Sequence, residues 1–458
     1  MRISQLIERT RIGLLGYGRE GAASHALLRE SGFTGPIDVF ADGPTKVPSD
    51  TALHLGDAAL ASLRGVDVLV RSPGFAPDHR LRRAADAAGI AQTTATNVFL
   101  AEARGDGLTV IGITGSKGKT TTSTLANLLL ARAGVPSTLV GNVGVPALAQ
   151  LEAIRRERRV AVLEMSSYQC DDLAVGPSIG VILDLFPEHM DWHGSIEAYF
   201  GAKAKMRAAQ REGDRFFYNF ASREHLARAL GPSWDARPGV EAINHPGGLH
   251  FADGAFLRGR GAFARDDGML LRGRHNRANA IAAFAVTEPL GVTPAHLEAV
   301  LREFSGLPYR LQSEGRHAGI LWINDSLSTA PEAASAALEA LAADVSVLIV
   351  GGFDRGYDYA PLIPAIRRSG LRAVITLPET GTRIAAQTRA ACPGLAVEEA
   401  KDLASAVDAA AKIAGPSGTC LFSPGAPSYN TYRSFEERGR HFHDLVTALD
   451  GRAVTAGA

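Results

Sequence analysis

The chain has 458 residues, of which 46% are hydrophobic, and its 48 basic residues balance its 48 acidic residues. A chain of this length is too long for one hydrophobic core, so we expect two or three domains. The balanced charge favours neither nucleic acid nor a membrane surface as a partner. Its three cysteines are scattered, and no apolar run reaches the ~18 residues that a membrane span needs. These features, with an N-terminus that lacks an apolar signal core, predict a cytoplasmic protein.

The first predicted element is a short strand within residues 11–21, which ends in the pattern G-x-G-x-x-G at Gly16, Gly18 and Gly21. A helix follows. Alone, this is a weak dinucleotide fingerprint, with Asp42 as the candidate ribose ligand. Because a second glycine-rich loop follows further along, we favour a Rossmann-like domain that binds another diphosphate over one that binds NAD.

Another strand, over residues 66–70, leads into the turn Arg71-Ser72-Pro73-Gly74. Open α/β domains bind ligands at the carboxyl edge of their strands, so Ser72 is a candidate binding residue. Gly105-Asp106-Gly107 is a plausible linker to the next domain.

The most informative stretch is Thr109–Thr122, TVIGITGSKGKTTT, which predicts a buried strand, a phosphate loop and a helix that opens at Lys119. Lys119 would reach the β- and γ-phosphates of a nucleotide, and the Thr120 hydroxyl would hold Mg²⁺. Ile113 stands where the general pattern has its first glycine. The alternative, a glycine-rich turn with an accidental Lys-Thr, is less favoured because a strand precedes the turn and a helix follows it.

Further buried strands are predicted at 160–167, 179–186 and 214–220 in a largely parallel sheet. Glu164 ends one strand, and His189 and Asp191 follow another. A carboxylate at a strand end facing a phosphate loop is suited to the Mg²⁺ that accompanies ATP. For Glu164 alone, a helix cap or a solvent-exposed carboxylate is an equally good explanation.

Asn276 and Asn279 open an Ala-rich helix with a spacing that puts both amides on one face. They could read the edge of an adenine, although Asn276 could also be a helix cap.

A composition shift near residues 304–308 is followed by strands and Ala-rich helices, which predicts a third α/β domain. Arg355 could grip a carboxylate, and Ser428 and Thr329 could donate hydrogen bonds. Taken alone, each is better explained as a turn residue than as a ligand residue. The last residues, 451–458, carry no pattern and are expected to be loose.

In this order, the motifs resemble those of the Mur ligases, the ATP-dependent amide ligases of peptidoglycan precursor synthesis. The resemblance covers nearly the whole chain and rests on GYGREG, RSPG, GITGSKGKTTT, GNVGVP, LEMSSYQ, FPEHMDWHG, HNRAN, GLPYRLQ, NDS, GGFDRG, SPGAPSY and FEERG. It implies an α/β fold of three domains. These are a Rossmann-like domain for the UDP group (1–104), a central P-loop ATPase-like domain with a mainly parallel sheet (105–303), and a Rossmann-like amino-acid-binding domain (304–458). A folylpolyglutamate synthetase would lack the first domain.

The resemblance also implies roles for single residues. ATP would be bound by Gly115, Ser116, Lys117, Gly118, Lys119, Thr120, Thr121, Asn276, Asn279, Arg310 and Asp325. Mg²⁺ would be held by Thr120, Glu164, His189 and a carbamylated Lys203. The substrates would be bound by Gly16, Gly18, Gly21, Ser72, Asn142, Ser166, Gln169, Thr329, Arg355, Ser428 and Phe435. Catalysis is expected to depend on Lys119, Glu164, His189 and Lys203.

Within the family, the chain is most similar to members that add glutamate to UDP-N-acetylmuramoyl-L-alanine. Members that add D-glutamate commonly carry lysines where this chain has Leu327 and Arg355, and Ala and Asp where it has Pro427 and Asn430. Since inverting the Cα moves the amine when both carboxylates are anchored, one set of anchors cannot serve both enantiomers well. The resemblance therefore implies an L-glutamate-adding monomer, with D-glutamate addition as the alternative.

Overall fold

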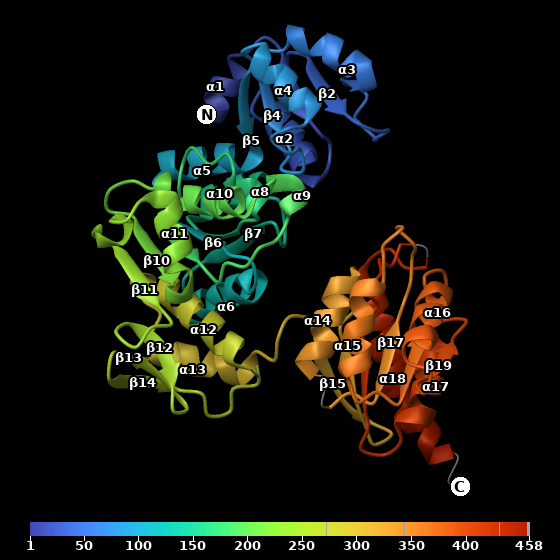
Figure 1. Cartoon of the computed structure of the whole chain (residues 1–458). Coiled ribbons are helices and arrows are strands. Elements are labelled where there is room, and N and C mark those ends of the chain that lie inside the picture. Colours follow the sequence, from blue (N-terminus) through green and yellow to red (C-terminus); the bar gives the residue numbers. More distant parts are fainter. Residues whose placement is uncertain (272, 342–343, 430, 456–458) are drawn as a thin grey trace. The chain divides into compact units, whose positions relative to one another are not determined.

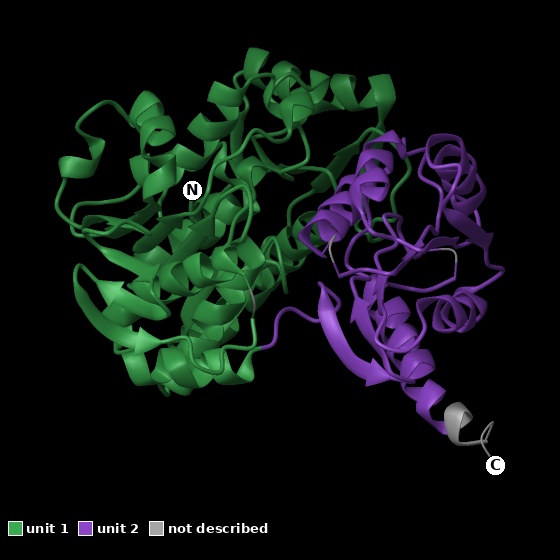
Figure 2. Ribbon diagram, turned by 60° about the horizontal axis from the view of Figure 1, so that its bottom comes forward, with its two compact units in different colours: residues 1–304 green, residues 305–458 purple. Residues whose placement is uncertain are grey.

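The structure is a computed structural model, and it describes residues 1–271, 273–341, 344–429 and 431–455 (Figure 1). The chain divides into two compact units, Met1–Phe304 and Ser305–Ala458, which Figure 2 colours separately. The predicted class is confirmed, because three mainly parallel sheets alternate with helices along the chain. No helix among the described residues is long and apolar enough to cross a membrane.

Unit 1 begins with a parallel sheet of strand order β3-β2-β1-β4-β5. Its strands are β1 (Ile12–Leu15), β2 (Ile37–Ala41), β3 (Thr51–Leu55), β4 (Val68–Arg71) and β5 (Ala91–Thr94). Its helices are α1 (Ile3–Ile7), α2 (Arg19–Glu30), α3 (Gly56–Ser62), α4 (Arg80–Ala87) and α5 (Ala95–Gly105). The central strand β1 runs directly into the Gly16 turn.

The second sheet of unit 1 has the order β14-β13-β12-β11-β10-β9-β6-β8-β7. Its strands are β6 (Val110–Thr114), β7 (Ser137–Gly141), β8 (Val160–Glu164), β9 (Ile179–Ile182), β10 (Arg215–Asn219), β11 (Val240–Ile243), β12 (Leu249–Ala252), β13 (Ala255–Arg258) and β14 (Gly261–Arg265). Its helices are α6 (Lys119–Arg132), α7 (Leu151–Glu157), α8 (Ser167–Cys170), α9 (Met190–His193), α10 (Ile196–Ala208), α11 (Arg223–Leu230), α12 (Arg274–Thr287) and α13 (Pro294–Glu303). The strands from β6 to β12 pair in parallel, whereas β12, β13 and β14 form antiparallel hairpins.

Helices cover both faces of this second sheet. Because strand side chains alternate between faces, Ile111 and Ile113 of β6 pack with α6 and α12, while Val110 packs on the opposite side. The core on that opposite side also contains α5, α10 and residues of the first sheet. A shared core explains why the two sheets form one unit. The predicted boundary after residue 104 lies near the end of α5, inside unit 1, and the three-domain division stays a prediction.

Unit 2 is built on a sheet of order β15-β16-β20-β17-β18-β19, in which only β15 pairs antiparallel. Its strands are β15 (Gln312–His317), β16 (Ile320–Asn324), β17 (Val347–Val350), β18 (Ala373–Thr376), β19 (Ala396–Glu399) and β20 (Thr419–Phe422). Its helices are α14 (Pro331–Leu341), α15 (Ile363–Arg368), α16 (Gly381–Ala391), α17 (Leu403–Ala414) and α18 (Phe435–Thr455).

The expectation of a loose C-terminus was wrong for residues 451–455, because α18 continues to Thr455. Phe442, Val446 and Leu449 of this helix are buried against the sheet of unit 2. A helix anchored in this way adds residues at low cost, so it extends past the last apolar position. Residues 456–458 lie outside the described part of the chain.

Candidate functional site

The phosphate loop connects the strand β6 to the helix α6. In the second sheet, β6 lies between β9 and β8. Gly115 has φ +156° and Gly118 has φ +83°, and Gly118 is the residue before the first turn of α6. A Cβ atom on Gly118 would lie 2.3 Å from Asn279 Oδ1. The turn therefore needs glycine for its backbone conformation and for the close approach of α12.

Two lysines converge on this loop. Lys119 Nζ donates to the carbonyl oxygens of Gly115 (2.9 Å) and Ser116 (2.8 Å). From α10, Lys203 Nζ donates to the same Gly115 carbonyl at 2.9 Å and to Thr114 Oγ1 at 3.4 Å. The loop thus carries a concentrated positive charge in addition to the positive end of α6, which suits it to bind an anion.

Lys203 is almost fully buried, with 1% of its surface exposed. Burial, reinforced by repulsion from Lys119, lowers the pKa of Lys203 to about 7. A substantial fraction of its amine is therefore neutral near neutral pH, as a reaction with CO₂ to form a carbamate requires.

Ser116 ties the loop to its surroundings. Its hydroxyl donates to Phe186 O at 2.8 Å, accepts from the backbone N–H of the same residue at 2.8 Å, and lies 2.8 Å from Tyr199 Oη. Burial raises the pKa of Tyr199 to about 12, so this phenol stays protonated. These bonds hold the loop in one shape before any ligand arrives.

Glu164 lies beside the loop because Ile113 of β6 pairs with it across the sheet. It is fully buried. Its carboxylate accepts hydrogen bonds from Asn142 Nδ2 at 2.9 Å and Ser123 Oγ at 3.3 Å. Of the sequence interpretations of Glu164, the solvent-exposed carboxylate is wrong, because the side chain is fully buried. The side chain is held in place at the carboxyl edge of the sheet.

His189 precedes α9 in the left-handed backbone region, with φ +57°. Partial burial and the nearby lysines Lys203 and Lys119 lower its pKa. A neutral imidazole of this kind can ligate a metal. Its ring lies 5.0 Å from the ring of Tyr168, which also stacks on His193.

In the part of the chain that the structure describes, protein side chains alone do not complete an Mg²⁺ site around the predicted ligands. Among the described residues, no three His, Cys, Asp or Glu side chains gather to hold a metal. Because Mg²⁺ commonly takes one or two protein groups together with water and substrate phosphates, its predicted ligands Thr120, Glu164, His189 and Lys203 stay a prediction.

Of the other predicted nucleotide residues, Asn279 is brought to the loop by α12. Its Oδ1 lies 3.4 Å from Thr122 Oγ1, and its Nδ2 donates to Asn276 Oδ1 at 3.2 Å. Thr121 is buried in the first turn of α6, whereas Lys117 is exposed and forms an ion pair with Glu188.

The glycine turn after β1 has the form that the sequence predicts. Gly16 has φ +87°, and a Cβ atom there would lie 2.7 Å from the ring of Phe75. A Cβ atom on Gly21 would lie 2.4 Å from Gly16 O. Gly18 caps α2, and Ser72 Oγ donates to Gly16 O at 3.3 Å. The four residues therefore form one turn at the carboxyl edge of the first sheet.

Glu20, which the sequence interpretation missed, links this turn to the second sheet. Its Oε1 accepts from Gln169 Nε2 at 2.6 Å. Gln169 in turn shares a capping box with Ser166 at the start of α8, two residues after Glu164. Glu20 thus connects α2, the helix that follows the glycine turn, to the predicted substrate residues Ser166 and Gln169.

In unit 2, Asp325 follows β16 and is 2% exposed. It accepts from Ser423 Oγ at 2.7 Å, Leu311 N at 3.1 Å and Ser328 Oγ at 2.5 Å. Burial raises the pKa of Asp325 to about 6 in spite of these bonds. Arg310 is exposed, Thr329 is half-buried, and Phe435 packs edge-on near Tyr309.

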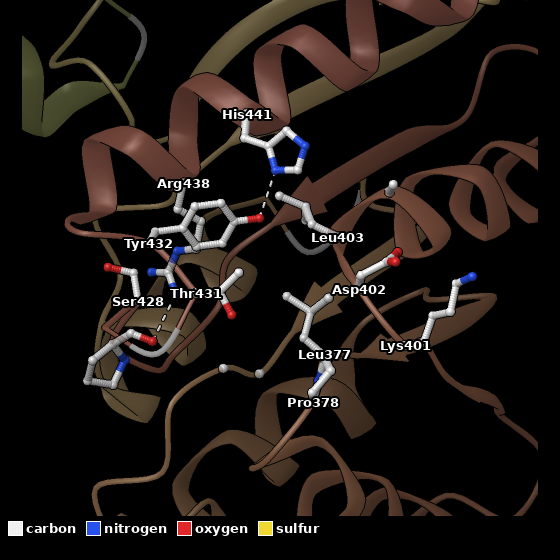
Figure 3. A pocket seen from close by; sticks show the side chains of 14 residues that line it. Leu377, Pro378, Lys401, Asp402, Leu403, Ser428, Thr431, Tyr432, Arg438 and His441 are labelled. Carbon is white, nitrogen blue, oxygen red and sulfur yellow. Dashed lines mark hydrogen bonds between the residues drawn. The ribbon is translucent and has the colours of Figure 1, made fainter.

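A cavity of about 290 Å³ opens at the carboxyl ends of β17, β18 and β20. Figure 3 shows Ser428 and Arg438 on one side, Lys401 and Asp402 on the other, and Leu377 and Leu403 between them. Of the predicted glutamate residues in unit 2, only Ser428 lines it. Open α/β sheets bind ligands at this edge.

Arg438 is 2% exposed, and its guanidinium donates to the carbonyl oxygens of Ser326 (2.9 Å), Ala426 (2.9 Å) and Pro427 (3.1 Å). Arg438 forms no ion pair with a carboxylate among the described residues, and burial lowers its pKa to about 10. Arg438 therefore fixes two loops around the cavity. The sequence signal for it was its place in the FEERG motif.

Arg355 and Tyr429 meet beside Ser428, with the guanidinium carbon 5.1 Å from the ring centroid. Tyr429 was not singled out in the sequence. Asn430, one of the positions used to judge the glutamate enantiomer, lies outside the described residues.

Comparison with known proteins identifies the family. Residues 113–235 match the model "Mur ligase middle domain", and residues 309–425 match "Mur ligase, glutamate ligase domain". A protein of Xanthomonas campestris pv. campestris (strain 8004), named UDP-N-acetylmuramoyl-L-alanine–L-glutamate ligase, is 36% identical over 470 residues, which cover 100% of this chain and 98% of the relative. A protein of the same name from a Micromonospora species is 34% identical over 473 residues, covering 98% of this chain and 99% of the relative.

Solved structures share the fold at lower identity. A UDP-N-acetylmuramoylalanyl-D-glutamyl-2,6-diaminopimelate–D-alanyl-D-alanyl ligase from Acinetobacter baumannii superposes with a TM-score of 0.58 at 17% identity, covering 97% of both chains. A MurF ligase from Thermotoga maritima, solved in complex with ADP, has a TM-score of 0.53 at 15% identity and covers 96% of this chain and 95% of its own. With relatives above 30% identity along its whole length, the chain belongs to the Mur ligase family.

Proposed function

We propose that this protein is an ATP-dependent ligase that joins L-glutamate to UDP-N-acetylmuramoyl-L-alanine and releases ADP and phosphate. The observation that carries the proposal is the meeting of the phosphate loop, Glu164 and Lys203 at one edge of the second sheet. The names of the full-length relatives support the same substrates. Because ATP is made and used in the cytoplasm, we propose that the protein works there, as a monomer.

The first requirement is to bring two anions together. An alanyl carboxylate is a poor acylating agent, so it must attack the γ-phosphate of ATP and form an acyl phosphate. In the proposed complex, Lys119 gives up its bonds to the loop carbonyls and binds the phosphates, while the loop N–H groups and the end of α6 stabilise the transferring phosphoryl group.

Thr120 and Glu164 would hold one Mg²⁺, and His189 and carbamylated Lys203 a second. When bound, Mg²⁺ would offset the charge of the phosphoryl groups. Asn142 and Ser123, which hold the Glu164 carboxylate, would keep it aimed at the phosphate loop. Carbamylation would convert the buried Lys203 from a cation into an anionic oxygen ligand.

The acceptor would bind at the carboxyl edge of the first sheet, and the amino acid would bind in unit 2. The glycine turn after β1 would bind the diphosphate of the UDP group at the start of α2, and the Ser166–Gln169 turn would direct the muramoyl part toward Glu164. Unit 2 would bind glutamate through Arg355, Ser428, Thr329 and Phe435. The glutamate amine then attacks the acyl phosphate, and the tetrahedral intermediate expels phosphate.

The test is ligation of UDP-N-acetylmuramoyl-L-alanine with each glutamate enantiomer separately, followed by product mass and phosphate release. We expect ATP-dependent turnover with L-glutamate and at least a tenfold lower kcat/KM with D-glutamate. Equal or greater turnover with D-glutamate would make the D-glutamate ligase the correct assignment.

The matched variants are Lys119→Ala in the phosphate loop and Lys412→Ala on the exposed surface of α17. Loss of the Lys119 charge removes stabilisation that exists in the phosphoryl transition state, so kcat should fall by about 10³-fold or more. Lys412→Ala should behave as the wild type. An undiminished rate in Lys119→Ala would rule out this use of the loop.

A further inference from the structure

Tyr429 is an exposed aromatic side chain at the carboxyl edge of the sheet in unit 2. It is 60% exposed, the largest exposed fraction among the large hydrophobic side chains that the structure describes. It directly follows Ser428, which lines the cavity beside Arg438. An exposed tyrosine ring can contact a charged neighbour through its face while its hydroxyl stays in water.

The ring is fixed from two directions. Phe353 approaches it edge-on, with centroids 6.4 Å apart and an interplanar angle of 79°. The backbone N–H of Phe353 donates to Pro427 O at 3.1 Å, so the loop after β17 and the loop after β20 are joined close in sequence to both rings. Arg355 also contacts the Tyr429 ring, with its guanidinium carbon over the ring at 5.1 Å from the centroid.

The Arg355 charge is available for a ligand. It is exposed, and within the described residues it takes part in no ion pair with a carboxylate. The adjacent Asp354 pairs instead with Arg383 at 2.8 Å. A guanidinium held over a ring can still donate two parallel hydrogen bonds to a carboxylate through its outward N–H groups.

We propose that Tyr429 is a positioning residue that holds the Arg355 guanidinium in place for a carboxylate of the incoming amino acid. This inference rests on the proposed function. A free arginine side chain has many rotamers, and fixing them in advance lowers the entropy lost when the substrate binds. Tyr429 therefore acts on substrate affinity through Arg355 and needs no contact with the substrate itself.

The experiment is a double-mutant cycle on the full chain in the ligation assay. The variants are Tyr429→Ala, Tyr429→Phe, Arg355→Gln and the double variant Arg355→Gln with Tyr429→Ala. Phe220→Ala is the matched control, because Phe220 is also an exposed aromatic residue, 40% exposed, and its ring contacts the ring of His245 in unit 1. The readouts are KM for L-glutamate, KM for ATP and kcat.

We expect Tyr429→Ala to raise KM for L-glutamate about tenfold, with KM for ATP unchanged. Tyr429→Phe should restore the wild-type value, because the ring face and not the hydroxyl contacts Arg355. In the Arg355→Gln background, Tyr429→Ala should add nothing. Phe220→Ala should match the wild type.

The inference is overturned if Tyr429→Ala leaves KM for L-glutamate unchanged, if its effect is additive with Arg355→Gln, or if KM for ATP rises equally. Failure of Tyr429→Phe to restore KM would also overturn it. These results leave the proposed ligase activity standing. A wild-type protein that ligates no glutamate would overturn the activity and this inference together.

Discussion

Lys203, Asp325 and Arg438 are among the charged side chains that are almost completely buried, and each belongs to a predicted site or lines a cavity. Lys203 is 1% exposed, and Asp325 and Arg438 are each 2% exposed. Burial moves every one of their pKa values toward the neutral form, to about 7 for Lys203, about 6 for Asp325 and about 10 for Arg438. Burying charge destabilises the folded state unless hydrogen bonds compensate, so these residues mark positions where folding energy is given up.

Asp325 allows this cost to be measured. Its folded pKa of about 6 lies above the ordinary value of 3.8, so the folded state binds the proton more tightly. The resulting penalty is absent below pH 3.8 and fully present above about pH 6. Asp325→Asn keeps an acceptor for Leu311 N and should stabilise the protein by up to about 3 kcal/mol at pH 7 and by less than about 1 kcal/mol at pH 4.

Urea unfolding at pH values from 4 to 7 measures this difference between the wild type and Asp325→Asn. Asp344→Asn, at an exposed position of the same unit, is the control and should show no pH-dependent difference. A gain for Asp325→Asn that does not change with pH would mean that the buried carboxylate is not the cause.

At the scale of elements, two tight glycine turns create the predicted binding edges of unit 1. The turn after β1 packs Gly16 and Gly21 against one another, and the turn after β6 brings Gly118 against α12. A Cβ atom on Gly21 would collide with Gly16 O, and a Cβ atom on Gly118 would collide with Asn279 Oδ1. The turns therefore depend on the packing of neighbouring elements as much as on their own backbone angles.

Gly118→Ala separates these two contributions when it is compared with Gly134→Ala. Gly134 has φ +72° but no atom within 4 Å of an added Cβ, so that variant should cost only about 1 kcal/mol for backbone strain. Gly118→Ala meets Asn279 Oδ1 as well, and we expect a loss of about 2–4 kcal/mol and at least tenfold weaker ATP binding. Equal effects in the two variants, measured by urea unfolding and titration calorimetry, would rule out the contact with α12 as a constraint.

At the scale of the whole molecule, the two units have separate cores. The core clusters of Met1–Phe304 share no residues with those of Ser305–Ala458. The first two sheets, by contrast, share one core through α5. Unfolding is therefore expected to occur in two steps, with the first two sheets melting together.

Differential scanning calorimetry should show two transitions, of which only the one from unit 1 responds to MgATP. At a nucleotide concentration 100 times Kd, binding stabilises the folded unit by about 2.7 kcal/mol, which corresponds to a rise of several degrees in Tm. Lys119→Ala should abolish this rise. A single transition that shifts as a whole would indicate that the two units unfold cooperatively.

Several features were predictable because they depend on local patterns. A continuous apolar run followed by a glycine turn and good helix formers specifies β6, the phosphate loop and α6, and the same reasoning gives β1 and α2. The antiparallel hairpins β12–β14 and the continuation of α18 to Thr455 were missed. The Asp253-Gly254 turn between β12 and β13 is a local hairpin signal that the sequence interpretation did not use, whereas the continuation of α18 depends on the distant surface that covers its apolar side chains.

The sequence by itself determined the fold class, the phosphate loop with Lys119 and the resemblance to the Mur ligases, because each is encoded in neighbouring residues whose types and spacing have one dominant physical use. Only the tertiary structure decided that Glu20 meets Gln169, which is 149 positions away, and that Arg438 binds Ser326, which is 112 positions away. The same is true of the ring of Tyr429 beneath Arg355. These contacts depend on how strands order themselves in a sheet, and the energy that selects the order is spread over whole cores.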